Sequence, residues 1–509
     1  MKIIKLMFSR FPILLLAFLL QIVGLAAIIG WQAQYFVWFW GVSLLFSLLV
    51  LLHMLNRDIA AEFKLPWMLL LIVSPIFGTV LYIFLANPKI GRRRTRALLE
   101  LERHRDEYLN AAPADREATD RMLGDYRGIE QYLLRTAYSR GFSDNRVEYY
   151  GDGARFFDAL SEALEGARSF IFLEYFIIER GALWDRIHAI LRRKQAEGVE
   201  VRILYDDLGT LGKLTWHYSR VLTAEGLTAR RFNPVRPILS GIYNYRDHRK
   251  IAVIDGKVSF TGGMNIGDEY AGITHPLGVW RDSGIRIEGG AVGNLTLLFL
   301  QLWATAGRGD TDCGRYFPPP SRMGKAEGYV HPFGSGPMPF YREQVAENTL
   351  LNLIGMAKRS VYITTPYLIV DRALLGALRN AAARGVDVRI VTPHVPDKRL
   401  VFLLTRASYR PLLEAGVRIL EFTPGFLHAK QMLVDGEIAF VGTVNLDYRS
   451  LSHHFECGAI LLGTPAIGDI GRDFEEIFSL SAEITGESFR LSPLARTAAA
   501  LLSLISPLF

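Results

Sequence analysis

A duplicated pattern constrains this chain more than any other feature. Each copy reads His-x-Lys-x4-Asp and is followed by an asparagine seventeen residues after its histidine. The residues concerned are His248, Lys250, Asp255 and Asn265 in the first copy, and His428, Lys430, Asp435 and Asn445 in the second. A single copy is more often a core histidine beside a surface lysine. Two copies at equal spacing indicate two related structural units that serve one functional site.

Similar segments precede the two copies. In each, a short apolar run rich in β-branched and aromatic residues is followed by a helical stretch, a glycine and a second apolar run. These segments are 167–176, 183–195 and 198–204 before the first copy, and 357–367, 372–383 and 385–391 before the second. Strand, helix and strand in this order predict a right-handed βαβ unit with a parallel core. We therefore expect an α/β fold of two similar α/β/α halves that form one active site, at residues 131–325 and 326–509, with a join near 316–339.

Each copy of the pattern also predicts a β-hairpin. The expected strands are 251–254 and 257–261 in the first copy, and 431–434 and 437–441 in the second. An Asp-Gly pair between two apolar runs is typical of a two-residue hairpin turn, so we interpret Asp255 and Asp435 as mainly structural members of the pattern. The histidine and the lysine lie two residues apart and project from the same face of a strand. The returning strand brings the asparagine to that face.

These residue types suit the chemistry of phosphodiesters. We expect Lys250 and Lys430 to neutralise phosphoryl oxygens, while the two asparagines donate amide hydrogen bonds to them. One histidine can be neutral and attack the phosphorus while the other is protonated and acts as an acid, because the pKa of imidazole lies near neutrality. Attack by histidine gives a covalent phosphohistidine, which passes its phosphoryl group to the next hydroxyl. This chemistry requires no metal and no other cofactor.

The N-terminal region contains three apolar runs without a formal charge, at residues 12–29, 35–55 and 66–86. A membrane-spanning helix needs about 20 such residues, so we expect residues 1–88 to form transmembrane helices of a multi-pass protein in the inner or plasma membrane. Two alternatives stay open. Residues 1–29 could be a cleaved signal peptide, or one run could be re-entrant or interfacial. The number of spans is therefore left open.

The charge distribution indicates where the rest of the chain lies. The net charge of +7 suits nucleic acid or anionic lipid, and the apolar runs favour a membrane partner over nucleic acid. Four arginines follow the third run and serve equally well as a surface anchor or as a positive-inside signal. They are Arg92, Arg93, Arg94 and Arg96. Either interpretation places the charged helical linker, 89–130, and the catalytic part on the cytoplasmic side. Lys2, Lys5 and Arg10 also favour the cytoplasmic side for the N-terminus. Three full spans cannot satisfy both preferences, because they would place the two ends of the apolar region on opposite sides of the membrane.

Cysteine and histidine usage points to neither a disulfide framework nor a zinc site. The chain has two cysteines, Cys313 and Cys457, and no cluster with the spacing of zinc ligands. We interpret the adjacent His453 and His454 as a polar surface or a substrate-facing site rather than a metal site. The apolar tail, 498–509, can pack on the domain or enter the membrane surface.

With its duplicated pattern the chain resembles the phospholipase D superfamily, and within it the bacterial cardiolipin synthases. The matching segments are 244–256, 262–270 and 280–282 in the first half, 442–450 and 455–456 in the second, and 74–82 in the apolar region. One departure from the broad superfamily is Gly263, where many members carry serine. Thr443 keeps a hydroxyl at the second position.

The resemblance also implies roles for individual residues. In the superfamily a downstream carboxylate orients each active histidine, and an acidic partner on one ring nitrogen is physically sensible. The residues at the matching positions are Asp282 and Glu456. Their alternative role is a salt bridge to Arg281 or Arg449. The family usually takes its nucleophile from the first copy of the pattern, which implies His248 as the nucleophile and His428 as the general acid.

The implied activity is the transfer of a phosphatidyl group between two phosphatidylglycerol molecules, which gives cardiolipin and glycerol. A phospholipase D-type hydrolase or another phosphatidyltransferase would use the same residues. A nuclease of the same superfamily suits the basic charge but not the apolar runs, and a lipid scaffold without enzymatic activity is the alternative from a different class. The sequence leaves the acceptor, the acyl preference and the oligomeric state open.

Overall fold

The computed structural model describes residues 16, 19–24, 33–57, 59–86, 123–235, 241–307, 314–317, 328–338, 340–486, 489 and 491–508. The chain forms two compact units. Unit 1 combines Met1–Gly91 with Val235–Tyr245 and Arg496–Phe509, and unit 2 consists of Arg92–Pro234 and Arg246–Ala495. Both ends of the chain and one internal segment therefore belong to unit 1.

Unit 1 is helical in its described part. Its elements are α3 (Ala33–Leu55), α4 (Ala61–Val73), α5 (Pro75–Leu85), η2 (Gly241–Asn244), most of α19 (Pro493–Ile505) and η4 (Ser506–Leu508). A small apolar core joins α3, α4 and α5 through Met54, Trp67, Leu71 and Tyr82. Gly78 lies against α4, where a Cβ atom would come within 2.8 Å of the Leu70 carbonyl oxygen. Many large apolar side chains of α3 nevertheless remain exposed, among them Trp38 at 74%.

The expected transmembrane helices are not found in the described part of this unit. Within the described ranges, no helix combines the length and the apolar character needed to cross a membrane. The third apolar run is divided at Ser74, where α4 ends and Pro75 begins α5, so two helices of 13 and 11 residues replace a single long one. The prediction of a multi-pass protein is therefore not supported. Most of the first run, 12–29, and the four arginines at 92–94 and 96 lie outside the described residues.

The C-terminal tail packs within unit 1. The short helix η4 contacts α4, and the side chains of Ala499 and Ser506 are buried. Leu501 and Ile505 on α19 remain exposed. The tail is thus packed on the protein over one side and leaves apolar side chains uncovered on another.

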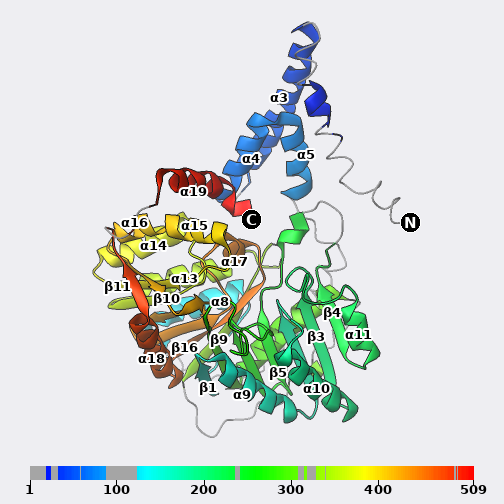
Figure 1. Ribbon diagram of the computed structural model, residues 1–509, viewed down its shortest axis with the longest axis vertical. Coiled ribbons are helices and arrows are strands. Elements are labelled where there is room, and N and C mark those ends of the chain that lie inside the picture. Colours follow the sequence, from blue (N-terminus) through cyan, green and yellow to red (C-terminus); the bar gives the residue numbers. More distant parts are fainter. Residues whose placement is uncertain are drawn as a thin grey trace. The chain divides into compact units, whose positions relative to one another are not determined.

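Unit 2 contains two sheets of similar construction (Figure 1). The first has the order β1-β8-β6-β5-β2-β3-β4, in which β2, β3 and β4 are parallel and the other neighbours are antiparallel. Its strands are β1 (Asn145–Tyr150), β2 (Phe170–Tyr175), β3 (Glu200–Asp206), β4 (Thr228–Phe232), β5 (Lys250–Ile254), β6 (Val258–Gly262) and β8 (Gly284–Gly289). Helices α9 (Gly153–Glu165) and α10 (Ala182–Ala196) bury apolar side chains against one face. On the opposite face, Phe299 of α12 (Val292–Ala306) stacks on Phe172.

The second sheet has the order β17-β12-β11-β10-β14-β15-β16-β9. Read from β9, it repeats the order of the first sheet and adds β17 at the far edge. Its strands are β9 (Tyr329–Ser335), β10 (Ser360–Thr364), β11 (Asp387–Pro393), β12 (Arg418–Phe422), β14 (Gln431–Val434), β15 (Ile438–Gly442), β16 (Glu456–Leu462) and β17 (Ser481–Ile484). The larger helices are α13 (Val345–Met356), α14 (Arg372–Ala383), α15 (Arg399–Ala407) and α18 (Ala466–Ser479). Shorter described elements of unit 2 are η1 (Gly124–Tyr126), α8 (Arg127–Thr136), α11 (Tyr218–Ala224), η3 (Gly314–Tyr316), α16 (Tyr409–Leu413) and α17 (Tyr448–Ser452).

The two halves share a buried interface. Helix α12 contacts β4 and β5 of the first sheet as well as β9 of the second, and nearly all of its residues are buried. Two short strands, β7 (Val279–Arg281) and β13 (Gly425–Leu427), pair in parallel from one half to the other. These contacts fix the halves side by side and determine where their loops meet.

The duplication predicted from the sequence is confirmed. The strand–helix–strand units are β2-α10-β3 and β10-α14-β11, and both strand pairs are parallel. The hairpins β5–β6 and β14–β15 are also present. Their turns have positive φ at Asp255 and Gly256 and at Asp435 and Gly436, as a two-residue turn of this kind requires. Most of the linker, 89–130, and residues 318–327 of the join lie outside the described residues.

Candidate active site

Each hairpin holds one His-Lys pair at the end of a sheet. Lys250 begins β5 and pairs with Tyr175, the last residue of β2. Lys430 directly precedes β14, whose Gln431 pairs with Thr364 at the end of β10. Both pairs therefore lie beyond the carboxyl ends of the parallel strands, where ligands bind in many α/β proteins.

The two aspartates of the pattern lie at the opposite end of their hairpins. Strand β5 separates Asp255 from Lys250 by roughly 16 Å at the rise of an extended strand. The Asp255 carboxylate accepts the backbone N–H groups of Arg168, Ser169 and Phe170. Asp435 accepts those of Lys358, Arg359 and Ser360 in the same way. The structure thus brings the histidines and lysines together and leaves both aspartates as anchors of the turn.

Each histidine is held by a carboxylate from the other half. His248 Nδ1 lies 3.0 Å from both carboxylate oxygens of Glu456, and His428 Nδ1 lies 2.7 Å from Asp282 Oδ2. All four side chains are buried. Because a carboxylate only accepts, each Nδ1 carries a hydrogen, which leaves each Nε2 for chemistry. The sequence singled out both carboxylates, but it did not indicate that they act crosswise.

Backbone hydrogen bonds fix the same crosswise arrangement. The His248 N–H donates to the carbonyl oxygen of Phe455, the residue before Glu456, at 2.9 Å. The His428 N–H donates to that of Arg281, the residue before Asp282, at 2.7 Å. Each histidine is therefore bound by main chain and by side chain to one segment of the other half. The salt bridge considered for Asp282 is not formed, since Arg281 pairs with Asp473 and Glu476.

The surroundings of the two carboxylates differ. Glu456 accepts hydrogen bonds from the hydroxyls of Thr443 and Ser450 as well as from His248. Asp282 accepts, besides His428, the backbone N–H of Ser283 at 2.8 Å. Gly263 occupies the place that corresponds to Thr443, and a Cβ atom there would collide with Asp282 Oδ1. The shorter carboxylate thus fills the space that a hydroxyl side chain takes in the other half.

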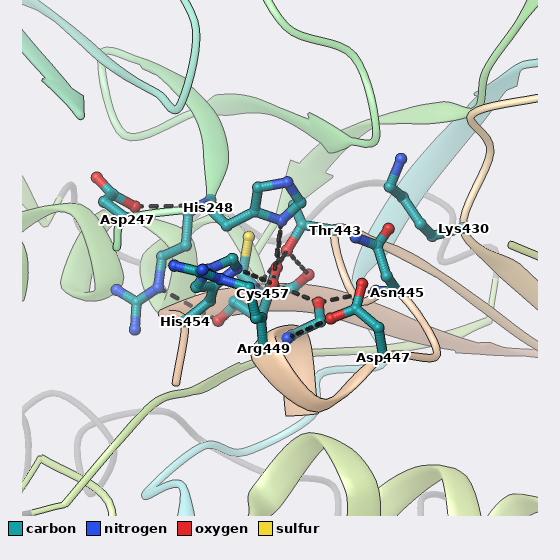
Figure 2. Close-up of polar contacts among 12 residues, drawn as sticks. Asp247, His248, Lys430, Thr443, Asn445, Asp447, Arg449, His454 and Cys457 are labelled. Atoms are coloured by element: carbon teal, nitrogen blue, oxygen red, sulfur yellow. Dashed lines mark hydrogen bonds and ion pairs between the residues drawn. The ribbon is translucent and has the colours of Figure 1, made fainter. Parts of the chain in front are cut away.

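A third histidine, His454, lies beside Glu456 and His248 (Figure 2). One ligand atom each from His248, His454 and Glu456 lies within 4.8 Å of the others, which is close enough for a metal ion. The Arg449 Nε–H, however, donates to His454 Nε2 at 3.1 Å. Nδ1 of His454 therefore carries the hydrogen, and it faces Glu456 Oε1 at 3.6 Å. This tautomer leaves no free nitrogen of His454 for a metal ion. Of the two positions that the sequence left open, a polar surface and a substrate-facing site, the structure favours the second, since His454 lies beside Glu456 and is largely buried.

Burial lowers the pKa values of the four central groups, and neighbouring positive charges lower those of His248, His428 and Lys430 further. Burial, together with Lys250 and Lys430, lowers the pKa of His248 well below its usual range. Burial lowers the pKa of His428 to about 4, against an opposing effect of Asp282. Burial also lowers the pKa of Lys250 to about 8 and that of Lys430 to about 7. Such an excess of buried positive charge is relieved by an anionic ligand.

Amide and aromatic side chains complete the immediate surroundings. The Asn265 amide donates to the Tyr270 hydroxyl at 2.9 Å, while the buried Asn445 Oδ1 has no hydrogen-bond partner among the described residues. The rings of Phe176 and His248 lie 5.0 Å apart between centroids, and those of Tyr270 and His428 lie 5.4 Å apart. The asparagines and rings therefore flank both histidines.

A buried ionic group beneath His248 was missed from the sequence. Arg246 binds Asp206 through Nε at 3.0 Å and through Nη2 at 2.7 Å. Arg249 crosses to the second half and donates to the Glu456 carbonyl oxygen at 3.2 Å. Burial raises the pKa of Asp247 above its usual value. The available signal was the density of charge in Arg246–Lys250, where four charged residues flank His248. Charged side chains at the start of a buried strand need partners inside the protein.

Comparison with known proteins decides the family. The model of the family described as "Cardiolipin synthase, PLD-like domain" matches residues 160–279 and 350–478. A cardiolipin synthase of Halalkalibacterium halodurans is 37% identical over 84% of this chain and 84% of its own length. The chain belongs to the phospholipase D-like cardiolipin synthase family.

Other members and neighbours agree with this assignment. A cardiolipin synthase of Geobacillus kaustophilus is 40% identical over 74% of this chain and 76% of its own length. Among solved structures, the phosphatidylserine synthase of Haemophilus influenzae superposes with a TM-score of 0.56 at 15% identity, over 75% of this chain and 97% of that one. At this identity the likeness shows the fold, namely two α/β halves of the phospholipase D type.

Proposed function

We propose that this member of the family is a cardiolipin synthase, which transfers a phosphatidyl group from one phosphatidylglycerol to another and releases glycerol. The observation that carries the proposal is the crosswise pair of histidines, each bound through Nδ1 to a carboxylate and each beside a buried lysine. Two imidazoles with free Nε2 atoms and two ammonium groups match the needs of an anionic phosphodiester. Membership of the family supports phosphatidylglycerol as both donor and acceptor.

In the first step, Nε2 of neutral His248 attacks the phosphorus of the donor. The negative charge of the bound phosphate raises the pKa of His428 from its value of about 4 in the free protein, so that His428 carries a proton on Nε2. The bond between phosphorus and the oxygen of the glycerol headgroup breaks, and His428 gives this proton to that oxygen, so glycerol leaves. Lys250 and Lys430 neutralise the two free phosphoryl oxygens. The product is a phosphatidyl group bound to His248 and a neutral His428.

In the second step, a hydroxyl of another phosphatidylglycerol gives its proton to His428 and attacks the same phosphorus. The bond between phosphorus and His248 breaks, and cardiolipin is released with both histidines restored. The unequal surroundings of the two carboxylates support this division of roles. Glu456 shares its charge with two hydroxyl donors, so it favours protonation of His248 less than Asp282 favours protonation of His428.

The product of the purified protein tests this function. With labelled phosphatidylglycerol as the sole lipid, we expect cardiolipin and glycerol in equal amounts. Phosphatidic acid as the sole product would instead mean a hydrolase, and cleavage of DNA without lipid turnover would mean a nuclease. A scaffold without activity predicts that cells keep their cardiolipin when His248→Ala and His428→Ala are combined.

We also propose that unit 1 attaches the protein to the inner or plasma membrane and that unit 2 works at its cytoplasmic face. The exposed apolar side chains of α3 support the attachment, because such a surface is typical of a membrane interaction site. Attachment also brings the protein to its two substrates, which reside in the bilayer. The basic residues 92–94 and 96 support the cytoplasmic side. In this proposal the two phospholipase D-like domains cover residues 131–325 and 326–509, after a linker at 89–130, and the segments Val235–Tyr245 and Arg496–Phe509 within these bounds fold with unit 1.

A further inference from the structure

The proposed reaction poses a second charge problem. The donor phosphate lies between the two histidines, and Lys250 and Lys430 neutralise it. The acceptor is also an anion, because its own phosphodiester lies three carbons away from the hydroxyl that attacks. Bringing two phosphates so close requires a further cation beside the site.

A small polar group of the second half stands at this place. Tyr367 follows β10, and Asp397 and Lys398 directly precede α15. The Tyr367 hydroxyl donates to Asp397 Oδ2 at 2.6 Å and accepts from Lys398 Nζ at 3.0 Å. Lys398 Nζ also lies 4.9 Å from the centre of the Tyr367 ring. These contacts hold a flexible side chain in one position while 61% of it stays exposed.

This group adjoins the catalytic residues. The residue after Tyr367, Leu368, forms a backbone bridge with Leu446, which directly follows Asn445. The positive charge of Lys398 contributes to the lowered pKa of His248, as do the charges of the two lysines of the duplicated pattern. Lys398 therefore lies within electrostatic reach of the reacting phosphorus, and its exposed side chain is accessible to a second headgroup.

Two other described cations, Arg246 and Lys213, are already engaged. Arg246 is bound to Asp206 by three hydrogen bonds. Lys213 pairs with Glu179 and lies 3.9 Å from Glu269. Lys398 has Asp397 at 3.4 Å, but that carboxylate also accepts the Tyr367 hydroxyl. Helix α15 in addition begins next to Lys398 without a side-chain cap, which adds partial positive charge.

We propose that Lys398, positioned by Tyr367, binds the phosphate of the acceptor phosphatidylglycerol. The group selects an acceptor that carries a phosphodiester, and it places the glycerol hydroxyl of that acceptor near His428. This assignment rests on the proposed cardiolipin synthase function, since a hydrolase has no anionic acceptor.

The test compares two acceptors for one covalent intermediate. In cardiolipin formation the acceptor is phosphatidylglycerol, which carries a phosphate. In the exchange of labelled glycerol into phosphatidylglycerol the acceptor is free glycerol, which offers the same kind of hydroxyl but carries no phosphate. We expect Lys398→Gln to lower the ratio of cardiolipin formation to glycerol exchange about tenfold, as the loss of one charge-assisted hydrogen bond implies. Tyr367→Phe, which keeps the ring and removes the hydroxyl, should lower the ratio by less.

The matched control is Lys257→Gln, which removes an exposed charge from the turn at the far end of β5. It should leave the ratio unchanged. An equal loss of both reactions in Lys398→Gln, or no change in the ratio, would overturn the subsite. Wild-type protein that exchanges glycerol but makes no cardiolipin would instead overturn the proposed function, so the two failures are distinguishable.

Discussion

At the level of single residues, His248 and His428 have nearly the same sequence context but different partners. Glu456 divides its negative charge among His248, Thr443 and Ser450, with His454 close by. Asp282 is bound by His428 and by one backbone N–H. A more concentrated charge stabilises an imidazolium better, so the surroundings favour His428 as the proton donor. The sequence alone could not distinguish the two roles, because Ser450 and His454 act through the fold.

A trapping experiment tests this division. In His428→Gln the attack by His248 lacks its acid and the return step lacks its base, so we expect turnover to fall by about 10²–10⁴ and the labelled phosphatidyl group to remain on His248. Peptide mapping of protein quenched after mixing with labelled phosphatidylglycerol locates the label. His248→Gln should carry none. Label on His428 in His248→Gln would reverse the assignment.

The buried lysines predict a pH dependence. Their lowered pKa values, about 8 for Lys250 and about 7 for Lys430, mean that the free protein loses these positive charges as the pH rises through that range. Phosphate binding needs the charged forms, so kcat/KM for phosphatidylglycerol should fall between about pH 7 and pH 9. In Lys430→Arg that side chain stays charged, and the fall should move to higher pH. A profile that is flat up to about pH 9 would contradict this.

At the level of elements, the hairpins carry the site and their aspartates stabilise the hairpins. Asp255 accepts three backbone N–H groups at the start of β2, which ties the turn to the neighbouring strand. We expect Asp255→Ala to lower the free energy of unfolding by about 2–4 kcal/mol. Thermal unfolding measures this, with Lys257→Ala on the same turn as the control. A large loss of kcat without any loss of stability would mean a direct catalytic role instead.

Elements were also the level at which sequence-based prediction succeeded best. The helix expected at 372–383 is α14, and the two Asp-Gly turns are where the pattern placed them. These features depend on local periodicity and turn chemistry. The same kind of reasoning was wrong for the third apolar run, 66–86, where it predicted one long helix. Pro75 has no N–H to continue the hydrogen bonding of α4, and a new helix starts there.

At the level of the whole molecule, the site belongs to neither half. Each half supplies a histidine and also the carboxylate that the other histidine needs. A linear sequence does not contain this information, since Asp282 follows His248 just as Glu456 follows His428. The crossing depends on the β7–β13 pair and on the buried interface around α12. It also explains why the duplication keeps both copies intact, because loss of one copy removes a partner from the other.

Unit 1 predicts how the whole protein finds its substrates. Leu45, Phe46 and Leu49 on α3 are each at least half exposed, and burial of such side chains in a lipid surface contributes about 1.5–3 kcal/mol each. Replacing all three with glutamate should therefore reduce sedimentation with phosphatidylglycerol vesicles more than tenfold and lower cardiolipin formation in parallel. Leu134→Glu, an exposed position on α8 of unit 2, is the control and should sediment like wild type. Unchanged vesicle binding of the triple variant would show that another surface makes the attachment.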